Sequence, residues 1–382
     1  MISASYPQLC LSVDALEQNI DIMARWCSER DVALAPHVKT TMSAPIIERQ
    51  VGAGALGVTV ATVDQAVTVL DWGHCSVLIA NQVVDSFGLS QLRSLLADDP
   101  GRKIQCFVDS EAGVKAAALA FGEPGPVLEV LLDIGAPVGR TGLRDIREAR
   151  RIAELVADAP GLKLVGVAGY EGIAPNTRNN ETIVSVDDHC RRVRDAYLDV
   201  ADLFETATPV FSMGGSAFPD RVVEFLPTVE EVPGTIRLLR SGCYVVHDHG
   251  TYAGVSPVPG LNPALTVRAV VLSAPEPGLV IIGAGKRDLP YDAGFPVLLA
   301  ASGVDGQRKP EARGIVRKLY DHHAVLEKAG GLEVGDVVQF GISHPCSAFD
   351  RWSSYLVTDV EGSVVDVWES NFLRSTRTLS EG

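Results

Sequence analysis

The feature that most limits the fold of this 382-residue chain is a regular alternation of short apolar runs with segments of helical periodicity. The runs have the length of buried strands, and the segments between them place apolar residues at helical spacing after an Asp, Ser or Thr. The expected strands are residues 33–39, 55–61, 76–81, 103–109, 127–135, 163–170, 209–215 and 235–242. Eight successive strand-then-helix units predict an α/β fold, a closed (β/α)8 TIM barrel.

The pattern changes near residue 255. Beyond this point Pro and Gly are frequent, long helical segments disappear, and the apolar runs have the character of short antiparallel strands. The N-terminal segment YPQLCLSV is apolar enough to be a further strand of the same region. We therefore expect a barrel over residues 11–254 and a mostly antiparallel β domain formed by residues 1–10 and 255–382.

Composition narrows the class of partner. The formal net charge is −15, without a basic stripe, which argues against nucleic acid because its phosphates are bound by clustered Lys and Arg. No window approaches the ~20 apolar residues of a membrane span, and the start lacks the features of a signal peptide. Seven cysteines without a CxxC pair fit reduced thiols. We expect a cytoplasmic protein that acts on a small molecule and binds neither nucleic acid nor membrane.

Lys39 is the first candidate for chemistry, in the stretch APHVKTTM at residues 35–42. It closes the first expected strand, and the carboxyl ends of barrel strands surround the active site. A partly desolvated lysine amine there can attack a carbonyl, as in the Schiff base that lysine forms with pyridoxal phosphate (PLP). The alternative is a solvated lysine at a strand end.

Other strand ends carry residues suited to a phosphorylated cofactor. The seventh strand ends in SMGGSA at 212–217, a turn whose amides can cradle a phosphate, and the eighth ends in RSGCY at 240–244. Arg140 follows the fifth strand, and Tyr170 ends the sixth. Each feature alone also fits a plain turn, a paired surface arginine or a packed tyrosine.

The order of these motifs, PHVKTT, DIGAPVGRTG, GYEG, SMGGSA and LLRSGCY, followed by a β domain with an HxC pair, resembles the fold-type III PLP enzymes. The closest resemblance is to the D-serine dehydratase and D-threonine aldolase group, relatives of alanine racemase, over nearly the whole chain. This chain has Thr41 and Met42 where the commoner pattern PHxKTHK has histidine and lysine.

The resemblance implies a set of cofactor residues. It makes Lys39 the Schiff-base lysine and places Arg140 near the phenolic oxygen of PLP and Tyr170 near its ring nitrogen. The remaining cofactor residues that we carry over are His37, Gly214, Gly215, Ser216, Gly242 and Tyr244. It also implies a homodimer, and the sequence does not say whether the partner subunit contributes to the site.

A metal pair is expected in the second domain. His344 and Cys346 are one residue apart, and on an extended segment both side chains point to the same side. Imidazole with thiolate favours Zn²⁺ over Mn²⁺ or Mg²⁺. In the resembling dehydratases this pair holds zinc. His323 is our candidate for a group near the metal or the substrate. The alternatives are a buried thiol beside a surface histidine, solvated histidines at 322 and 323, and a rival ligand pair, His247 and His249.

The resemblance and the HxC pair together favour PLP-dependent, zinc-assisted β-elimination of a β-hydroxy D-amino acid such as D-serine to a 2-oxo acid and ammonia. In this scheme Lys39 removes the α-proton, and the metal assists departure of hydroxide. The first alternative is D-threonine aldolase-type cleavage to glycine and an aldehyde, with His323 as the base. Amino-acid racemisation and a non-catalytic PLP-binding protein stay open. The β-hydroxy substrate itself is not specified.

Overall fold

The computed structural model describes residues 5–122 and 124–372. The chain divides into two compact units. The barrel unit comprises residues 24–39 and 50–242, and the β unit comprises the described residues of segments 1–23, 40–49 and 243–372. This division rests on spatial contacts. The β unit includes residues 11–23, 40–49 and 243–254, which we expect in the barrel from the sequence. The boundaries expected from the sequence, at residues 10 and 254, therefore stay a prediction.

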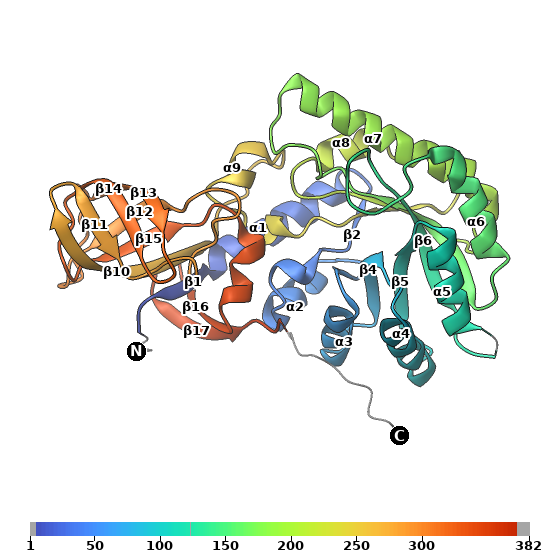
Figure 1. Cartoon of the computed structure of the whole chain (residues 1–382), viewed down its shortest axis with the longest axis horizontal. Coiled ribbons are helices and arrows are strands. Elements are labelled where there is room, and N and C mark those ends of the chain that lie inside the picture. The colour runs from blue at the N-terminus through green and yellow to red at the C-terminus, as the bar shows by residue number, and fades with distance from the viewer. Residues whose placement is uncertain (1–4, 123, 373–382) are drawn as a thin grey trace. The chain divides into compact units, whose positions relative to one another are not determined.

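Eight parallel strands form the barrel unit (Figure 1). They are β2 (Ala33–Leu34), β3 (Val58–Val60), β4 (Ser76–Gln82), β5 (Lys103–Val108), β6 (Leu128–Ile134), β7 (Leu162–Gly169), β8 (Val210–Met213) and β9 (Ile236–Leu239). Their order is β2-β9-β8-β7-β6-β5-β4-β3. The first and last strands of this order meet through a parallel bridge between His37 and Thr59 and through the Thr59 amide, which donates to the Pro36 carbonyl at 2.9 Å. The expected parallel barrel is confirmed.

Helices connect the strands, and several begin where the sequence offers a side-chain cap. The caps are Thr62, Asp85, Ser110 and Asn179, each of which accepts a hydrogen bond from a backbone amide of the first turn. The helices that lie wholly in this unit are α3 (Val63–Asp71), α4 (Ser86–Asp98), α5 (Glu111–Phe121), α6 (Ala149–Ala157), α7 (Asn180–Asp199) and α8 (Pro219–Glu224), with short 3-10 turns η2 (Ile146–Glu148) and η3 (Ala201–Leu203). Two helices have residues assigned to both units. They are α1 (Val13–Ser28) and α2 (Ala44–Gly52).

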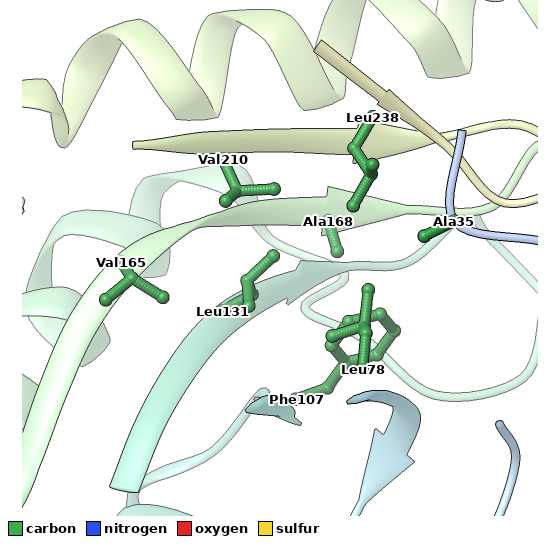
Figure 2. Close-up of a cluster of buried hydrophobic side chains, with 8 residues drawn as sticks. All are labelled: Ala35, Leu78, Phe107, Leu131, Val165, Ala168, Val210 and Leu238. Atoms are coloured by element: carbon green, nitrogen blue, oxygen red, sulfur yellow. The ribbon is translucent and has the colours of Figure 1, made fainter. Parts of the chain in front are cut away.

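The barrel interior is filled by apolar side chains from successive strands (Figure 2). The cluster consists of Ala35, Leu78, Phe107, Leu131, Val165, Ala168, Val210 and Leu238, all buried. Each large side chain in it contributes about 1.5–3 kcal/mol by leaving water. Because the interior is packed, only the loops that follow the strands are free to carry a site.

The β unit contains a nine-stranded sheet. Its strands are β1 (Gln8–Ser12), β10 (Leu265–Glu276), β11 (Leu279–Ile282), β12 (Val297–Ser302), β13 (Arg313–Leu319), β14 (Ala324–Gly330), β15 (Val337–Gly341), β16 (Ser354–Thr358) and β17 (Val364–Glu369). All pairs are antiparallel except β1 with β16. Strand β1 lies between β10 and β16, with Leu9 opposite Val267 and Cys10 opposite Leu356. The expected β domain and its N-terminal strand are confirmed.

Two local expectations are wrong. Strand β2 ends at Leu34, so Lys39 does not close a strand but lies in the 3-10 turn η1 (Val38–Thr40). Pro36 supplies no amide hydrogen, which favours the end of a strand. The HxC segment is extended only at His344, because Pro345 begins a 3-10 turn, η5 (Pro345–Ser347). Short helical turns therefore carry both motifs.

The β unit has three further short elements, η4 (Cys243–Val245), α9 (Thr251–Val255) and η6 (Phe349–Arg351). Within residues 5–122 and 124–372, no helix combines the length and apolar character needed to cross a membrane.

Candidate active site

Positive charge surrounds His37 in the barrel unit. Its Nδ1 is 3.1 Å from the carbonyl oxygen of Thr59. Burial holds the pKa of His37 well below its ordinary value, and the nearby charges of Lys39, Arg240 and Arg140 lower that pKa further. His37 is therefore a neutral imidazole among three cations. Such a cluster favours an anionic ligand.

Arg240 is buried just beyond the end of β9. Its guanidinium donates to Ser212 Oγ at 2.5 Å and to the Gly169 carbonyl at 2.6 Å. Burial lowers its pKa, and the negative charge of Glu171 opposes that shift. A buried guanidinium held at two strand ends fixes a positive charge at this edge of the barrel. The sequence contained this arginine, but only the packing reveals its burial and partners.

The turn after β8 can bind an oxyanion. Gly214 has a φ of +98°, and the amides of Gly214 and Gly215 donate to the two carboxylate oxygens of Glu171 at 3.1 and 2.6 Å. A neighbouring hydroxyl, Ser216 Oγ, is buried, and no hydrogen-bond partner for it occurs among the described residues. Ser241 Oγ donates to the Gly215 carbonyl at 2.7 Å and holds the turn. The two amides thus bind a carboxylate in this structure, and the Ser216 hydroxyl, unpaired among the described residues, remains available for a further acceptor.

The backbone of another segment comes close to Gly242. A Cβ placed there would lie 2.3 Å from the carbonyl oxygen of His37, so only glycine fits without a shift of the backbone. Together the turn amides, Ser216, Gly242 and the surrounding cations have the character of a phosphate cradle. These residues of the barrel unit fit PLP, and Lys39 is the lysine of the cluster.

Arg140 lies over the ring of Tyr170, with its guanidinium carbon 4.6 Å from the ring centre. The loop that carries it is held by Arg144, which donates to the carbonyls of Gly139, Thr141 and Gly142 at 2.8–2.9 Å. The amide of Gly142 also donates to Asp109 at 2.9 Å. The structure thus brings Arg140 and Tyr170 together. Their roles at a cofactor stay a prediction.

The expected metal pair lies in the β unit. Burial lowers the pKa of His344, but a hydrogen bond with Cys346 and the charges of Cys346, Asp292 and Asp248 raise it above its ordinary value. The Nδ1 atom of His344 is buried and has no hydrogen-bond partner among the described residues. An unpaired imidazole nitrogen and a nearby thiol are suitable donors for a soft divalent cation. The pair therefore fits a metal.

A second cysteine adjoins this pair. Cys243 Sγ is 3.1 Å from Cys346 Sγ, and Thr40 Oγ1 is 3.6 Å from the first sulfur and 3.9 Å from the second. The hydrogen bond with Cys243 and burial raise the pKa of Cys346 well above its ordinary value. No local pattern in the sequence links Cys243 to this pair, because it lies 103 residues before Cys346.

The remaining residues expected at the site are His323 and Tyr244, and the rival metal ligands are His247 and His249. His323 is exposed on the β unit, as is His322, whose Nδ1 lies 4.0 Å from Asp288. Tyr244 is buried in η4. The rival histidines flank Asp248, and His247 Nδ1 contacts the carbonyl of Asp248 at 3.0 Å. Across the described part of the chain, no three His, Cys, Asp or Glu side chains gather as a metal-binding group. The role of His323 stays a prediction.

Two family models match the chain. Residues 11–218 match the alanine racemase N-terminal domain, and residues 264–358 match the serine dehydratase domain. The first match covers more than half of the chain, so the chain belongs to the alanine racemase N-terminal domain family. With its eight-stranded barrel and antiparallel second domain, it has the alanine racemase-like fold of the fold-type III PLP enzymes.

Individual proteins that are similar over nearly the whole chain include an aldolase and a dehydratase. The chain is 27% identical to a D-threonine aldolase from Arthrobacter sp., over 95% of this chain and 91% of that protein. It is 26% identical to D-threo-3-hydroxyaspartate dehydratase from Delftia sp. strain HT23, over 97% of this chain and 98% of that protein. The crystal structure of D-threonine aldolase from Filomicrobium marinum superposes with a TM-score of 0.80 at 27% identity, covering 96% of this chain and 95% of that one. These relatives are lyases that act on D-amino acids.

Proposed function

We propose that this chain is a PLP-dependent, zinc-assisted lyase that eliminates water from a β-hydroxy D-amino acid, such as D-serine, to yield a 2-oxo acid and ammonia. The observation that carries the proposal is the cluster of Lys39, Arg140 and Arg240 around a neutral His37 in the barrel unit. A cationic cluster with a lysine beside an oxyanion-binding turn is suited to a phosphorylated aldehyde. A dehydratase and an aldolase among the relatives supply the reaction classes.

The residues of the barrel unit would divide the work of holding the cofactor. Lys39 Nζ would bind its aldehyde carbon, and the amides of Gly214 and Gly215 with Ser216 Oγ would bind its phosphate in place of the Glu171 carboxylate. When bound, PLP supplies an electron sink for negative charge at the substrate Cα. Lys39 Nζ, once displaced by the substrate amine, would accept the α-proton. Arg240 would keep a fixed positive charge beside these groups.

His344 and Cys346 would hold the zinc ion. Zinc supplies Lewis acidity to the β-hydroxyl, a poor leaving group. Cys346 is our reason for preferring dehydration. A thiolate and an imidazole favour zinc over Mg²⁺ or Mn²⁺, and the same pair holds zinc in the dehydratases that the chain resembles.

The second candidate is cleavage to glycine and an aldehyde, as named for the Arthrobacter relative. It would require a base that takes the proton of the β-hydroxyl. His323 is our candidate for this base, and it is exposed on the β unit.

The test is product analysis with the full-length protein reconstituted with PLP and Zn²⁺. D-Serine, D-threonine and D-threo-3-hydroxyaspartate are supplied separately, with the L-enantiomers as controls. Ammonia with a 2-oxo acid supports elimination, and its loss on chelation and return with Zn²⁺ supports the metal role. Glycine with an aldehyde identifies an aldolase instead, enantiomer exchange identifies a racemase, and the absence of every product identifies a carrier.

Replacing Lys39 tests the cofactor site. Lys39→Ala is expected to remove the visible absorbance of protein-bound PLP and to lower turnover about 10³-fold, since a positioned base contributes about 10²–10⁴-fold. The control is Lys115→Ala, because Lys115 is exposed on α5 and pairs with Glu111. Full turnover in the Lys39 variant would reject the proposed site.

We also propose a homodimer and a cytoplasmic location, both of which rest on the resemblance and the composition. Light scattering of the purified protein tests the first expectation. Fractionation of the native host cells tests the second.

A further inference from the structure

Two cysteines of the β unit lie closer together than unbonded sulfur atoms normally do. Cys243 is in η4 and Cys346 is in η5, and their sulfur atoms are 3.1 Å apart. Neither cysteine belongs to a disulfide bond. Cys243 is buried, whereas Cys346 is partly exposed. One thiol of the pair is therefore the more accessible to a small oxidant.

The separation does not suit two thiolates on one zinc ion. Zinc binds sulfur at about 2.3 Å, and a tetrahedral angle then places two sulfur ligands about 3.8 Å apart. A disulfide requires about 2.05 Å, so the present pair would close by ~1 Å. The geometry therefore favours a covalent partner for Cys346 over a shared metal ligand.

We propose that Cys243 and Cys346 form a reversible disulfide that withdraws Cys346 from the metal site. The proposal rests on the proposed function, which assigns Cys346 to the metal, and it makes Cys243 a redox partner of that ligand. The oxidant is a peroxide, and hydrogen peroxide serves as the probe. Oxidation then blocks metal binding, and reduction restores it.

The reaction balances in two steps. Cys346 sulfur attacks a peroxide oxygen, the O–O bond breaks, and the released hydroxide leaves as water with the proton of the Cys346 thiol, leaving a sulfenic acid. Cys243 sulfur then attacks Cys346 sulfur and the S–O bond breaks. The second hydroxide leaves as water with the proton of the Cys243 thiol. Two thiols and one hydrogen peroxide thus yield one disulfide and two waters, and a dithiol returns the two electrons and two protons.

A bound metal protects the pair, because the sulfur electron pair that attacks peroxide is engaged by the ion. Oxidation is therefore expected in metal-free protein and suppressed in metal-loaded protein. The metal ion and Cys243 therefore compete for the sulfur atom of Cys346, and this competition decides whether that sulfur binds metal or forms the disulfide.

The first experiment maps the disulfide. Full-length Cys75→Ser protein, which lacks the exposed thiol of the barrel unit, is stripped by a chelator and treated with equimolar hydrogen peroxide. Peptide mass spectrometry is expected to find a peptide pair joining Cys243 to Cys346, with the loss of two free thiols. The same treatment after Zn²⁺ loading is expected to give at least about tenfold less of this pair. A sulfinic acid at Cys346 in place of the disulfide, or unmodified thiols, overturns the proposal.

The second experiment measures Zn²⁺ binding by a competition titration, without reference to activity. Oxidised protein is expected to bind at least about 100-fold more weakly than reduced protein, since loss of even an outer-shell partner costs about 10–100-fold. A dithiol is expected to restore binding. Equal binding by the oxidised and reduced proteins overturns the proposal.

Variants of Cys243 separate formation of the disulfide from binding of the metal. Cys243→Ser and Cys243→Ala, each in the Cys75→Ser background, are expected to form no such peptide pair. With no neighbouring thiol to trap it, the sulfenic acid at Cys346 is expected to be carried by a second equivalent of peroxide to a sulfinic acid, so that a dithiol no longer restores Zn²⁺ binding. Recovery of Zn²⁺ binding by a dithiol in both variants after this treatment would overturn the proposal. Reduced parent protein that binds no Zn²⁺ would contradict the metal role in the proposed function, whereas the disulfide map would still report separately on the cysteine pair.

Discussion

His189 shows how burial and neighbouring charge act on one residue. It lies on α7, has 6% of its surface exposed, and lines a cavity of about 850 Å³ together with Glu171 and Arg192. Burial, helped by the charges of Arg192 and Arg144, lowers the pKa of His189 to about 4. The folded protein therefore keeps this imidazole neutral at pH values where the unfolded chain is protonated.

This pKa predicts a pH-dependent loss of stability. Between pH 6.5 and about 4 the unfolded state binds a proton that the folded state does not, so stability falls as the pH falls through this window. The full effect is about 3 kcal/mol, at 1.36 kcal/mol for each pKa unit. His189→Gln is expected to reduce the fall in unfolding temperature between pH 7 and pH 4.5. The control is His322→Gln, because His322 is exposed. Parallel profiles for His189→Gln and the unmodified protein would contradict the assignment.

At the scale of the elements, the turns after β8 and β9 each contain a close backbone contact. Gly214 adopts a positive φ, and its amide meets Glu171, whereas Gly242 approaches the His37 carbonyl. Neither contact is encoded by the spacing of apolar residues. Each depends on two strands that are far apart in sequence and adjacent in the barrel.

Gly242→Ala is expected to weaken PLP binding about tenfold or more. The added methyl group would meet the His37 carbonyl, at a cost of about 1–3 kcal/mol, and each 1.4 kcal/mol is a factor of ten in affinity. Titration of the metal-free protein with PLP, followed by visible absorbance, measures the change. The control is Gly254→Ala on α9, where a Cβ meets no atom within 4 Å. Equal affinities for the two variants would contradict the role of this turn.

On the scale of the whole molecule, the N-terminal strand ties distant parts of the chain into one sheet. β1 pairs with β10 and β16, so residues 8–12 lie between segments that follow more than 250 and 340 residues later. Its residues Leu9, Cys10 and Leu11 are all buried. The β unit therefore forms only after nearly all of its chain is available.

Leu11→Ala is expected to destabilise the β unit by about 3 kcal/mol, because a buried Leu→Ala change removes apolar contacts and leaves a cavity. Leu272→Ala on β10 is the matched control, since Leu272 is 49% exposed and the same change there is expected to cost below about 1 kcal/mol. Urea unfolding followed by circular dichroism measures both. Equal midpoints for the two variants would show that β1 does not stabilise the sheet.

Much of the architecture was predictable because its signals are local. All eight barrel strands and the N-terminal strand were expected in place, since the alternation of apolar runs is read over a few neighbouring residues. The limits of extended segments are less predictable, as at Leu34, where β2 ends, and at Pro345, where a 3-10 turn begins. A strand ends at the last residue that forms backbone hydrogen bonds with a neighbouring strand, and that neighbour can be far away in the sequence. Strands β12 and β13 are less predictable, since they carry exposed apolar residues such as Val297 and Ile315 that obscure the alternation of apolar and polar positions.

By itself, the sequence determined the class of fold, the lysine motif and the HxC pair, because strand periodicity and short motifs depend only on nearby residues. Tertiary structure alone decided that Glu171 meets the amides of Gly214 and Gly215 and that Arg240 is buried against Gly169. It also decided that Cys243 lies beside Cys346. The physical reason is that contacts between distant segments depend on how strands and turns pack, which no local pattern specifies.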